Sequence, residues 1–162
     1  MEYLGIYDKS GQYTGRKIER GDKNLKADEY IKLTVIWVKA KDKFLIQKAS
    51  REKGSNYCVT GGHVTDGNNS FEQALLEFKE EMGFTLNPQK LKPLGSIFLN
   101  QGIFDVYMYE DDDMINAKFN YQAIEVEDSV WLTKKEIEKL IKKGTFRKSS
   151  EIHYNTFIKY NF

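Results

Sequence analysis

Three closely spaced glutamates are the residues whose types and spacing are best suited to chemistry. Glu77, Glu80 and Glu81 lie in the segment 70–82, where apolar residues recur at helical spacing. At about 100° per residue, the three carboxylates share an arc of about 100° on one side of a helix. Like charges on adjacent turns repel each other, and Mg2+ prefers such hard oxygen ligands. A solvated acidic helix face is the alternative, and the helix alone favours that alternative.

A glycine-rich segment precedes this helix. Thr60-Gly61-Gly62-His63 is predicted to form a tight turn, which would bring backbone N–H groups close to a phosphate. A Gly-Gly pair alone is weak evidence, because most such pairs are only turns. Lys53 and Arg51 come shortly before this segment and could bind phosphate charge. A solvated loop explains them equally well.

Together, the glycine segment and the acidic helix resemble the Nudix box, whose pattern is G-x5-E-x7-R-E-U-x-E-E-x-G-U with U apolar. Seven positions match without insertion or deletion: Gly62, Glu77, Phe78, Glu80, Glu81, Gly83 and Phe84. The flanks resemble the Nudix branch related to isopentenyl-diphosphate isomerase, from Tyr7-Asp8 to Trp131-Leu132. The resemblance therefore covers most of the chain, and a chance match of this kind is rare.

The resemblance implies a fold and a reaction. The fold is an α/β (α+β) domain, the Nudix α/β/α sandwich with a mixed central sheet. Glu77, Glu80 and Glu81 would bind Mg2+, with Mn2+ as a substitute, at the diphosphate of a nucleotide-derived small molecule. Hydrolysis of the phosphoanhydride bond would use Glu80, Glu81 and a late carboxylate that accepts a proton from water. Glu125 is the preferred candidate for that carboxylate, and Glu127, Asp128 and Asp112 are its rivals.

The chain departs from the family pattern at three positions. Asn68 stands where the box has Glu, Leu76 where it has Arg, and Ala49 where the isomerase-like branch often has Arg. In the family, the first two positions support the loop and help to orient a metal-binding Glu. Losing both charges together is self-consistent, whereas losing one would strand a charge. A catalytically weak or inactive nucleotide-binding module is therefore the alternative function.

Isomerisation of isopentenyl diphosphate is a weaker alternative. That enzyme uses a catalytic Cys and several His metal ligands, but this chain has one Cys and two His. Cys58 is expected to be a small buried residue, and His63 to be structural or to support the site. No role is predicted for His153.

The predicted elements that position these residues begin with strands. Alternating apolar residues predict a strand over 31–40 and a hairpin partner over 44–47. A second hairpin is predicted from 94–99 and 103–109, and a further strand over 126–132. These strands alternate with helices, which indicates an α/β or α+β domain.

Three helices are predicted. The first begins at Ser70, with Gln73 as its capping-box partner, and stops at Gly83. Thr133 and Glu136 form a second capping box. A last helix is predicted over 150–160.

Composition limits the partners. The 162 residues fit a single domain spanning 1–162. A net charge of +1 gives no general reason to expect a nucleic-acid polymer or an anionic membrane as a partner. No apolar run is long enough to span a bilayer, and no signal peptide is recognisable. Because Cys58 is the only cysteine, no internal disulfide can form, which suits the cytoplasm. A homodimer is left open.

Overall fold

A mixed seven-stranded sheet forms the centre of the molecule. The computed structural model describes residues 1–162. β3 pairs in parallel with β8, and the other pairings in this sheet are antiparallel. The strands are β3 (Ile31–Ala40), β4 (Lys43–Ala49), β5 (Tyr57–Cys58), β6 (Thr60–His63), β7 (Leu91–Leu99), β8 (Gly102–Glu110) and β9 (Val126–Leu132).

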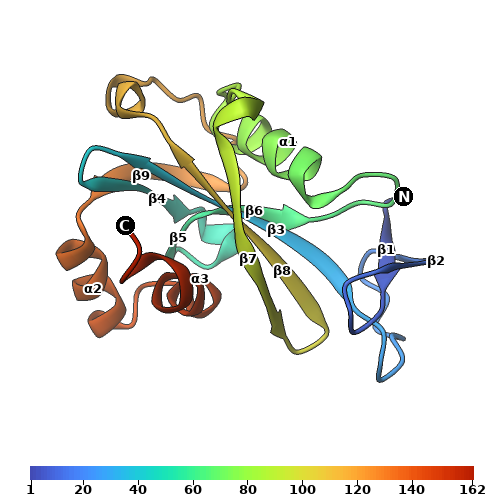
Figure 1. Cartoon of the computed structure of the whole chain (residues 1–162). Coiled ribbons are helices and arrows are strands. Elements are labelled where there is room, and N and C mark those ends of the chain that lie inside the picture. The colour runs from blue at the N-terminus through green and yellow to red at the C-terminus, as the bar shows by residue number, and fades with distance from the viewer.

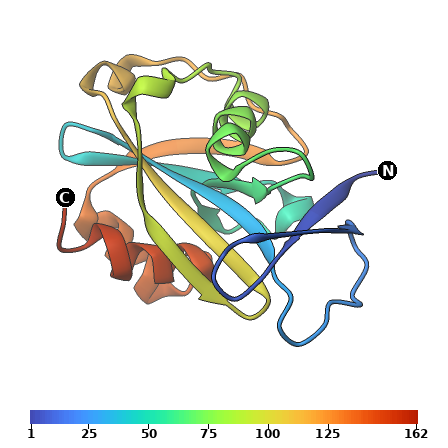
Figure 2. The same cartoon turned by 45° about the vertical axis from the view of Figure 1, so that its right-hand side comes forward.

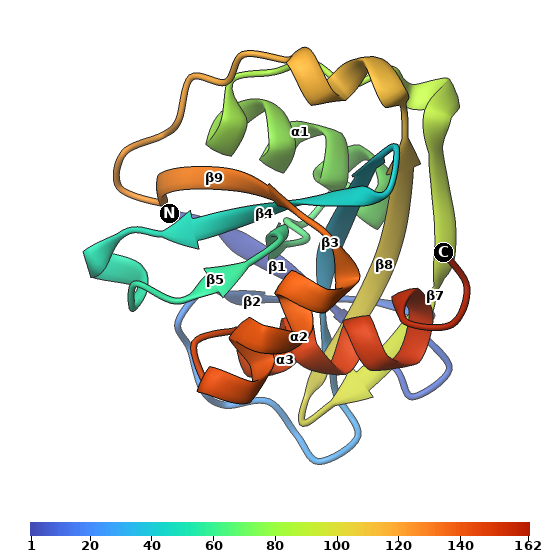
Figure 3. The same cartoon turned by 90° about the vertical axis from the view of Figure 1, so that its left-hand side faces the viewer.

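Helices cover both faces of this sheet (Figure 1). α1 (Ser70–Met82) lies on one face. α2 (Lys134–Lys143) and α3 (Lys148–His153) lie on the other face, where α3 continues as a π-helical turn, Tyr154–Ile158. Figure 3 shows the three layers from the side of β9 and β4. The predicted α/β/α sandwich is confirmed. None of the helices combines the length and the apolar character needed to cross a membrane.

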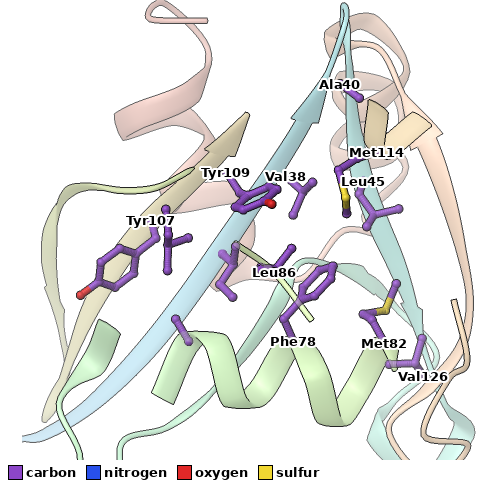
Figure 4. Close-up of a cluster of buried hydrophobic side chains, with 13 residues drawn as sticks. Val38, Ala40, Leu45, Phe78, Met82, Leu86, Tyr107, Tyr109, Met114 and Val126 are labelled. Atoms are coloured by element: carbon purple, nitrogen blue, oxygen red, sulfur yellow. The ribbon is translucent and has the colours of Figure 1, made fainter. Parts of the chain in front are cut away.

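The alternation of β3 divides the core in two. Ile36 and Val38 point toward α1, whereas Val35 and Trp37 point toward α2 and α3. All four are at most 5% exposed, as expected for a central strand that is covered on both faces. Figure 4 shows the first cluster, in which Phe78 and other side chains of α1 pack against strand residues.

The N-terminal residues form a separate two-stranded sheet of β1 (Tyr3–Tyr7) and β2 (Tyr13–Glu19). It lies at the side of the molecule opposite α2 (Figure 2). An isolated bridge from Leu4 to Thr65 connects it to the segment before α1. This pair was not predicted, because β2 is almost entirely exposed and shows no alternating burial.

The predicted central strands and both hairpins are confirmed, with small changes at their ends. The predicted cap of α1 is wrong by one residue. Asn69 is the N-cap, and its side chain accepts a hydrogen bond from the Glu72 N–H at 2.8 Å. The Ser70 hydroxyl is instead 2.7 Å from the Tyr107 hydroxyl, so it is not free to cap the helix.

The two C-terminal helix predictions have different outcomes. The capping box of Thr133 and Glu136 is present at the start of α2. The last helix begins at Lys148 rather than Ser150, and its α-helical part ends at His153. The following residues form a π-helical turn that ends at Ile158, two residues before the predicted end.

The predicted tight turn at residues 60–63 is also wrong, because these residues form β6. β4 leaves β3 after two residue pairs, and β6 then pairs with the same edge of β3, with Gly62 opposite Thr34 and Gly61 opposite Val35. The sheet therefore splits into two arms. A hydrogen bond from the Gln47 amide to the Thr60 hydroxyl joins them.

Candidate active site

The phase of α1 is set by its apolar residues. Ala74, Phe78 and Met82 are fully buried against the sheet. This packing turns Glu77 and Glu81 toward the split between the sheet arms. Glu81 is only 7% exposed, Glu77 is half-buried and Glu80 is exposed. The predicted acidic face is therefore graded from buried to solvated.

Glu81 is in an unusual electrostatic position. Burial, followed by the nearby charge of Glu77, raises the pKa of the Glu81 carboxyl to about 8. Gln47 and Arg147 act in the opposite direction and favour the charged form. A buried carboxylate without a matching charge is costly, so a cation placed beside Glu81 would be stabilising.

Glu77 fills the space where Gly62 has no side chain. A Cβ added to Gly62 would lie 2.3 Å from the Glu77 Cδ, which explains a glycine here without any unusual backbone angle. Burial is the main cause that raises the pKa of Glu77. The Gln73 amide donates a hydrogen bond to Glu77 Oε1 at 2.8 Å and lowers the pKa in return.

Gln73 also connects the helix to the preceding loop. Its Oε1 accepts hydrogen bonds from the Asn68 amide at 3.0 Å and from the Thr65 hydroxyl at 3.1 Å. Asn68 is the position where the family pattern has Glu. Two uncharged side chains, Asn68 and Gln73, therefore orient the Glu77 carboxyl group here. Leu76, at the position of the family Arg, is 39% exposed.

The carboxylates provide the oxygen ligands that a hard divalent cation prefers, but they do not form a closed metal site. No three His, Cys, Asp or Glu side chains are gathered closely enough to enclose a metal ion. Mg2+ usually takes one or two carboxylates together with waters and substrate phosphate oxygens. The buried Glu81 and the Glu77 carboxylate lodged against Gly62 are suitable donors for such an open site.

A cavity of about 290 Å³ opens beside Glu81. Five of the residues selected from the sequence line it: Lys53, Gly61, Gly62, Glu81 and Glu125. Glu77 lies behind Gly62, whereas Glu80 and Arg51 are exposed and do not line the cavity. Most of the sequence-derived residues are thus brought to one place, with Arg51 as the clearest exception.

Glu125 is the only one of the four late carboxylates to line the cavity. Lys53 Nζ lies 3.2 Å from its Oε1. Glu127 instead forms an ion pair with Lys48 at 3.5 Å, and Asp112 accepts a hydrogen bond from the Lys41 N–H. This placement favours Glu125 over its rivals as the carboxylate near the reacting atoms.

Several cavity residues were not found from the sequence. Arg20 and Arg147 add two cations to Lys53, while Ser149, Ser150 and His153 come from the start of α3 and its last turn. No local motif marks these residues, because the fold brings them to α1 from distant parts of the chain. Cys58 also lines the cavity, but burial raises the pKa of its thiol to about 11, so it remains protonated.

Comparison with known proteins agrees with this geometry. Residues 31–152 match the NUDIX domain family. The chain belongs to the Nudix family. An uncharacterised Nudix hydrolase of Listeria monocytogenes is 27% identical over 150 residues, which cover 90% of this chain and 88% of the relative. As a member of this family, the protein is a pyrophosphohydrolase.

Solved structures share the fold. DR0079 from Deinococcus radiodurans has a TM-score of 0.75 at 19% identity. The match covers 95% of this Nudix chain and 98% of the DR0079 chain. A bifunctional NMN adenylyltransferase/ADP ribose pyrophosphatase from Francisella tularensis, complexed with AMP and a Mn ion, has a TM-score of 0.60 at 13% identity. That match covers 75% of this chain and 39% of the other.

Proposed function

We propose that this Nudix protein is a Mg2+-dependent hydrolase of an organic diphosphate, such as a nucleoside diphosphate linked to another group. The observation that carries the proposal is the buried carboxylate of Glu81 in the wall of a cavity that also presents Lys53, Arg20 and Arg147. Cationic side chains suit a diphosphate, and the carboxylate suits a divalent cation. The Francisella tularensis protein, of which 39% matches this chain, is complexed with AMP and a Mn ion, which are ligands of the same type.

Each residue has a proposed role. Glu77, Glu80 and Glu81 hold the metal, which when bound polarises the phosphoanhydride and lowers the pKa of a water. Glu80 and Glu81 act in catalysis through that metal site. Glu125 accepts a proton from the attacking water. This transfer leaves Glu125 protonated and delivers a hydroxide oxygen to phosphorus as the anhydride bond breaks.

The remaining residues bind and orient the substrate. Lys53 neutralises phosphate oxygens while keeping Glu125 in position, and the exposed Arg51 supplies longer-range attraction to the anion. Gly61 and Gly62 leave room for the substrate and for Glu77, because neither has a side chain. Mn2+ is expected to replace Mg2+, since both accept oxygen ligands.

A substrate panel tests this function. It contains nucleoside triphosphates, ADP-ribose, dinucleoside polyphosphates, sugar nucleotides and diphosphate alcohols, each with Mg2+ and with Mn2+. At least one member should release phosphate, pyrophosphate or a nucleoside monophosphate, and a chelator should stop the release. Glu80→Gln and Glu81→Gln should each lower the rate by at least about 10²-fold.

Glu72→Gln is the matched control, because Glu72 is an exposed acid in the first turn of the same helix. This control should retain full turnover. Absence of turnover with every substrate and both metals, combined with nucleotide-induced thermal stabilisation, would instead identify a nucleotide-binding module. The departures at Asn68 and Leu76 are the features that favour that second reading.

A further inference from the structure

A second part of the cavity wall is formed by residues that are far from α1 in the sequence. Phe104 of β8 and His153 of α3 contribute to it, together with Ser149 and Ser150. The rings of Phe104 and His153 contact each other, with centroids 5.0 Å apart. Phosphate chemistry requires none of these side chains, so they point to recognition of another part of the ligand.

His153 is unusual among the buried polar residues. His153 is only 1% exposed, and neither of its ring nitrogens has a hydrogen-bond partner within the protein. Buried polar groups are nearly always paired, because leaving one unpaired costs free energy. Only Glu29 and Trp37 also have a buried side-chain atom without a partner, and neither residue lines this cavity.

The imidazole is uncharged at neutral pH, because burial lowers the pKa of His153 to about 4. A neutral imidazole offers one N–H donor and one acceptor nitrogen. An uncharged donor and acceptor next to an aromatic ring suits a neutral polar group rather than a phosphate. The cations Lys53 and Arg147 line the same cavity, so both parts of one ligand can be bound together.

We propose that His153 is a specificity-determining residue that hydrogen-bonds an uncharged polar group in the part of the substrate attached to the diphosphate. Phe104 packs against the same part of the substrate. The inference deepens the proposed function and rests on it for the identity of the diphosphate. The polar group belongs either to a heterocyclic base or to a sugar hydroxyl, since both present neutral donors and acceptors.

Binding tests the inference without catalysis. The chain has two histidines, so its imidazole nitrogen resonances are few, and the His153→Gln variant assigns the signal of His153. AMP, GMP, CMP and UMP are titrated without metal, in parallel with their 2′-deoxy forms, ribose 5-phosphate and inorganic phosphate. At least one nucleotide should shift the His153 signal, whereas inorganic phosphate should not.

The same titration separates the two sources of the polar group. A shift that ribose 5-phosphate reproduces assigns the contact to a sugar hydroxyl. A shift that depends on the base and survives removal of the 2′-hydroxyl assigns it to the heterocycle. Unchanged His153 resonances with every ligand, while backbone resonances of the cavity do shift, would overturn the inference.

Kinetics with variants provides the second readout. His153→Leu should lower kcat/KM for the preferred substrate by at least about 10-fold. It should change kcat/KM little for an analogue that lacks the recognised group, so the selectivity of the enzyme decreases. His153→Gln retains a donor and an acceptor and should restore part of that selectivity.

Thermal melts of variants distinguish a role of His153 in ligand recognition from a purely structural role. His153→Leu should raise the Tm by about 2–4 °C, because it removes an unpaired buried polar group. The control Tyr154→Phe removes a hydroxyl that donates to Glu138 at 2.7 Å outside the cavity. This control should lower the Tm and leave selectivity unchanged.

Three outcomes are distinct. If wild-type protein hydrolyses no substrate, the proposed function fails, but the resonance titration still tests His153 as a ligand contact. If hydrolysis occurs and His153→Leu lowers kcat/KM equally for all substrates while also lowering the Tm, His153 is structural and the inference is wrong. Loss of selectivity with a retained or higher Tm supports it.

Discussion

Replacing Gln73 tests whether uncharged side chains orient Glu77, one of the proposed metal ligands. Gln73 is 3% exposed and donates to Glu77 at 2.8 Å while accepting from Asn68 at 3.0 Å. Gln73→Met keeps the length of the side chain and removes these hydrogen bonds. A hydrogen bond to a charged group contributes about 1.5–3 kcal/mol, and a neutral one about 1 kcal/mol. Because Glu77 and Asn68 are half-buried, water can replace part of the hydrogen bonding that the variant loses.

We expect a net loss of about 2–3 kcal/mol and a decrease in Tm of about 5–10 °C. The functional effect should be larger than this stability loss implies. Groups that orient a metal ligand typically change metal affinity or activity by about 10–100-fold. Calorimetry with Mn2+, a metal titration of turnover and a thermal melt without metal would measure the three quantities separately.

Asn69→Ala provides the matched control. It removes the N-cap of α1, which costs about 0.5–2 kcal/mol, without removing any hydrogen bond to Glu77. The control should lower the Tm and leave the apparent metal affinity unchanged. If Gln73→Met also left the metal affinity within about twofold of wild type, Gln73 would be only a brace between loop and helix, and the argument for orientation would be refuted.

Three further predictions concern α1 and the residues next to it. Glu81→Gln should stabilise the metal-free protein increasingly as pH rises from 5 to 8, in paired melts. The folded-state pKa of about 8 lies above the unfolded value, so ionisation of the wild-type carboxyl destabilises the fold across this window. A difference in Tm between variant and wild type that stayed constant with pH would contradict this prediction. Gly62→Ala should weaken Mn2+ binding in calorimetry, because the new Cβ displaces Glu77; unchanged affinity would show that Glu77 can bind from another rotamer. Asn68→Glu and Leu76→Arg should show positive coupling of about 0.5–3 kcal/mol in a double-mutant cycle of Tm and turnover, whereas additive effects would mean that the two positions do not interact.

The central part of the fold could be predicted because its signals are local. The apolar alternation of β3 and the helical repeat of Ala74, Phe78 and Met82 both correspond to burial in the structure. The N-terminal sheet and β5 lack such signals. β2 is mostly exposed, and β5 has only two residues, so their formation depends on tertiary pairing rather than on a repeating pattern.

The glycine pair illustrates a limit of local interpretation. Gly61 and Gly62 were predicted to be a turn because glycine usually permits one. Here they belong to a strand, and the reason for a glycine at 62 is the Glu77 carboxylate at close range. The turn was predicted from residues 60–63 alone, and Glu77 lies outside that segment. The same limit hid His153, whose environment depends on Phe104 in a distant strand.

The departures from the family box make physical sense once the hydrogen bonds are considered together. A Glu and an Arg at positions 68 and 76 would add no net charge, and neither do Asn68 and Leu76. Orientation of Glu77 needs a donor on its own side of the helix, and Gln73, four residues earlier, is in that position. Leu76 is then free to lie at the surface, where it is 39% exposed. Loss of the charged pair therefore removes one way of orienting Glu77 while Gln73 supplies another, and the proposed metal ligands keep their places on α1.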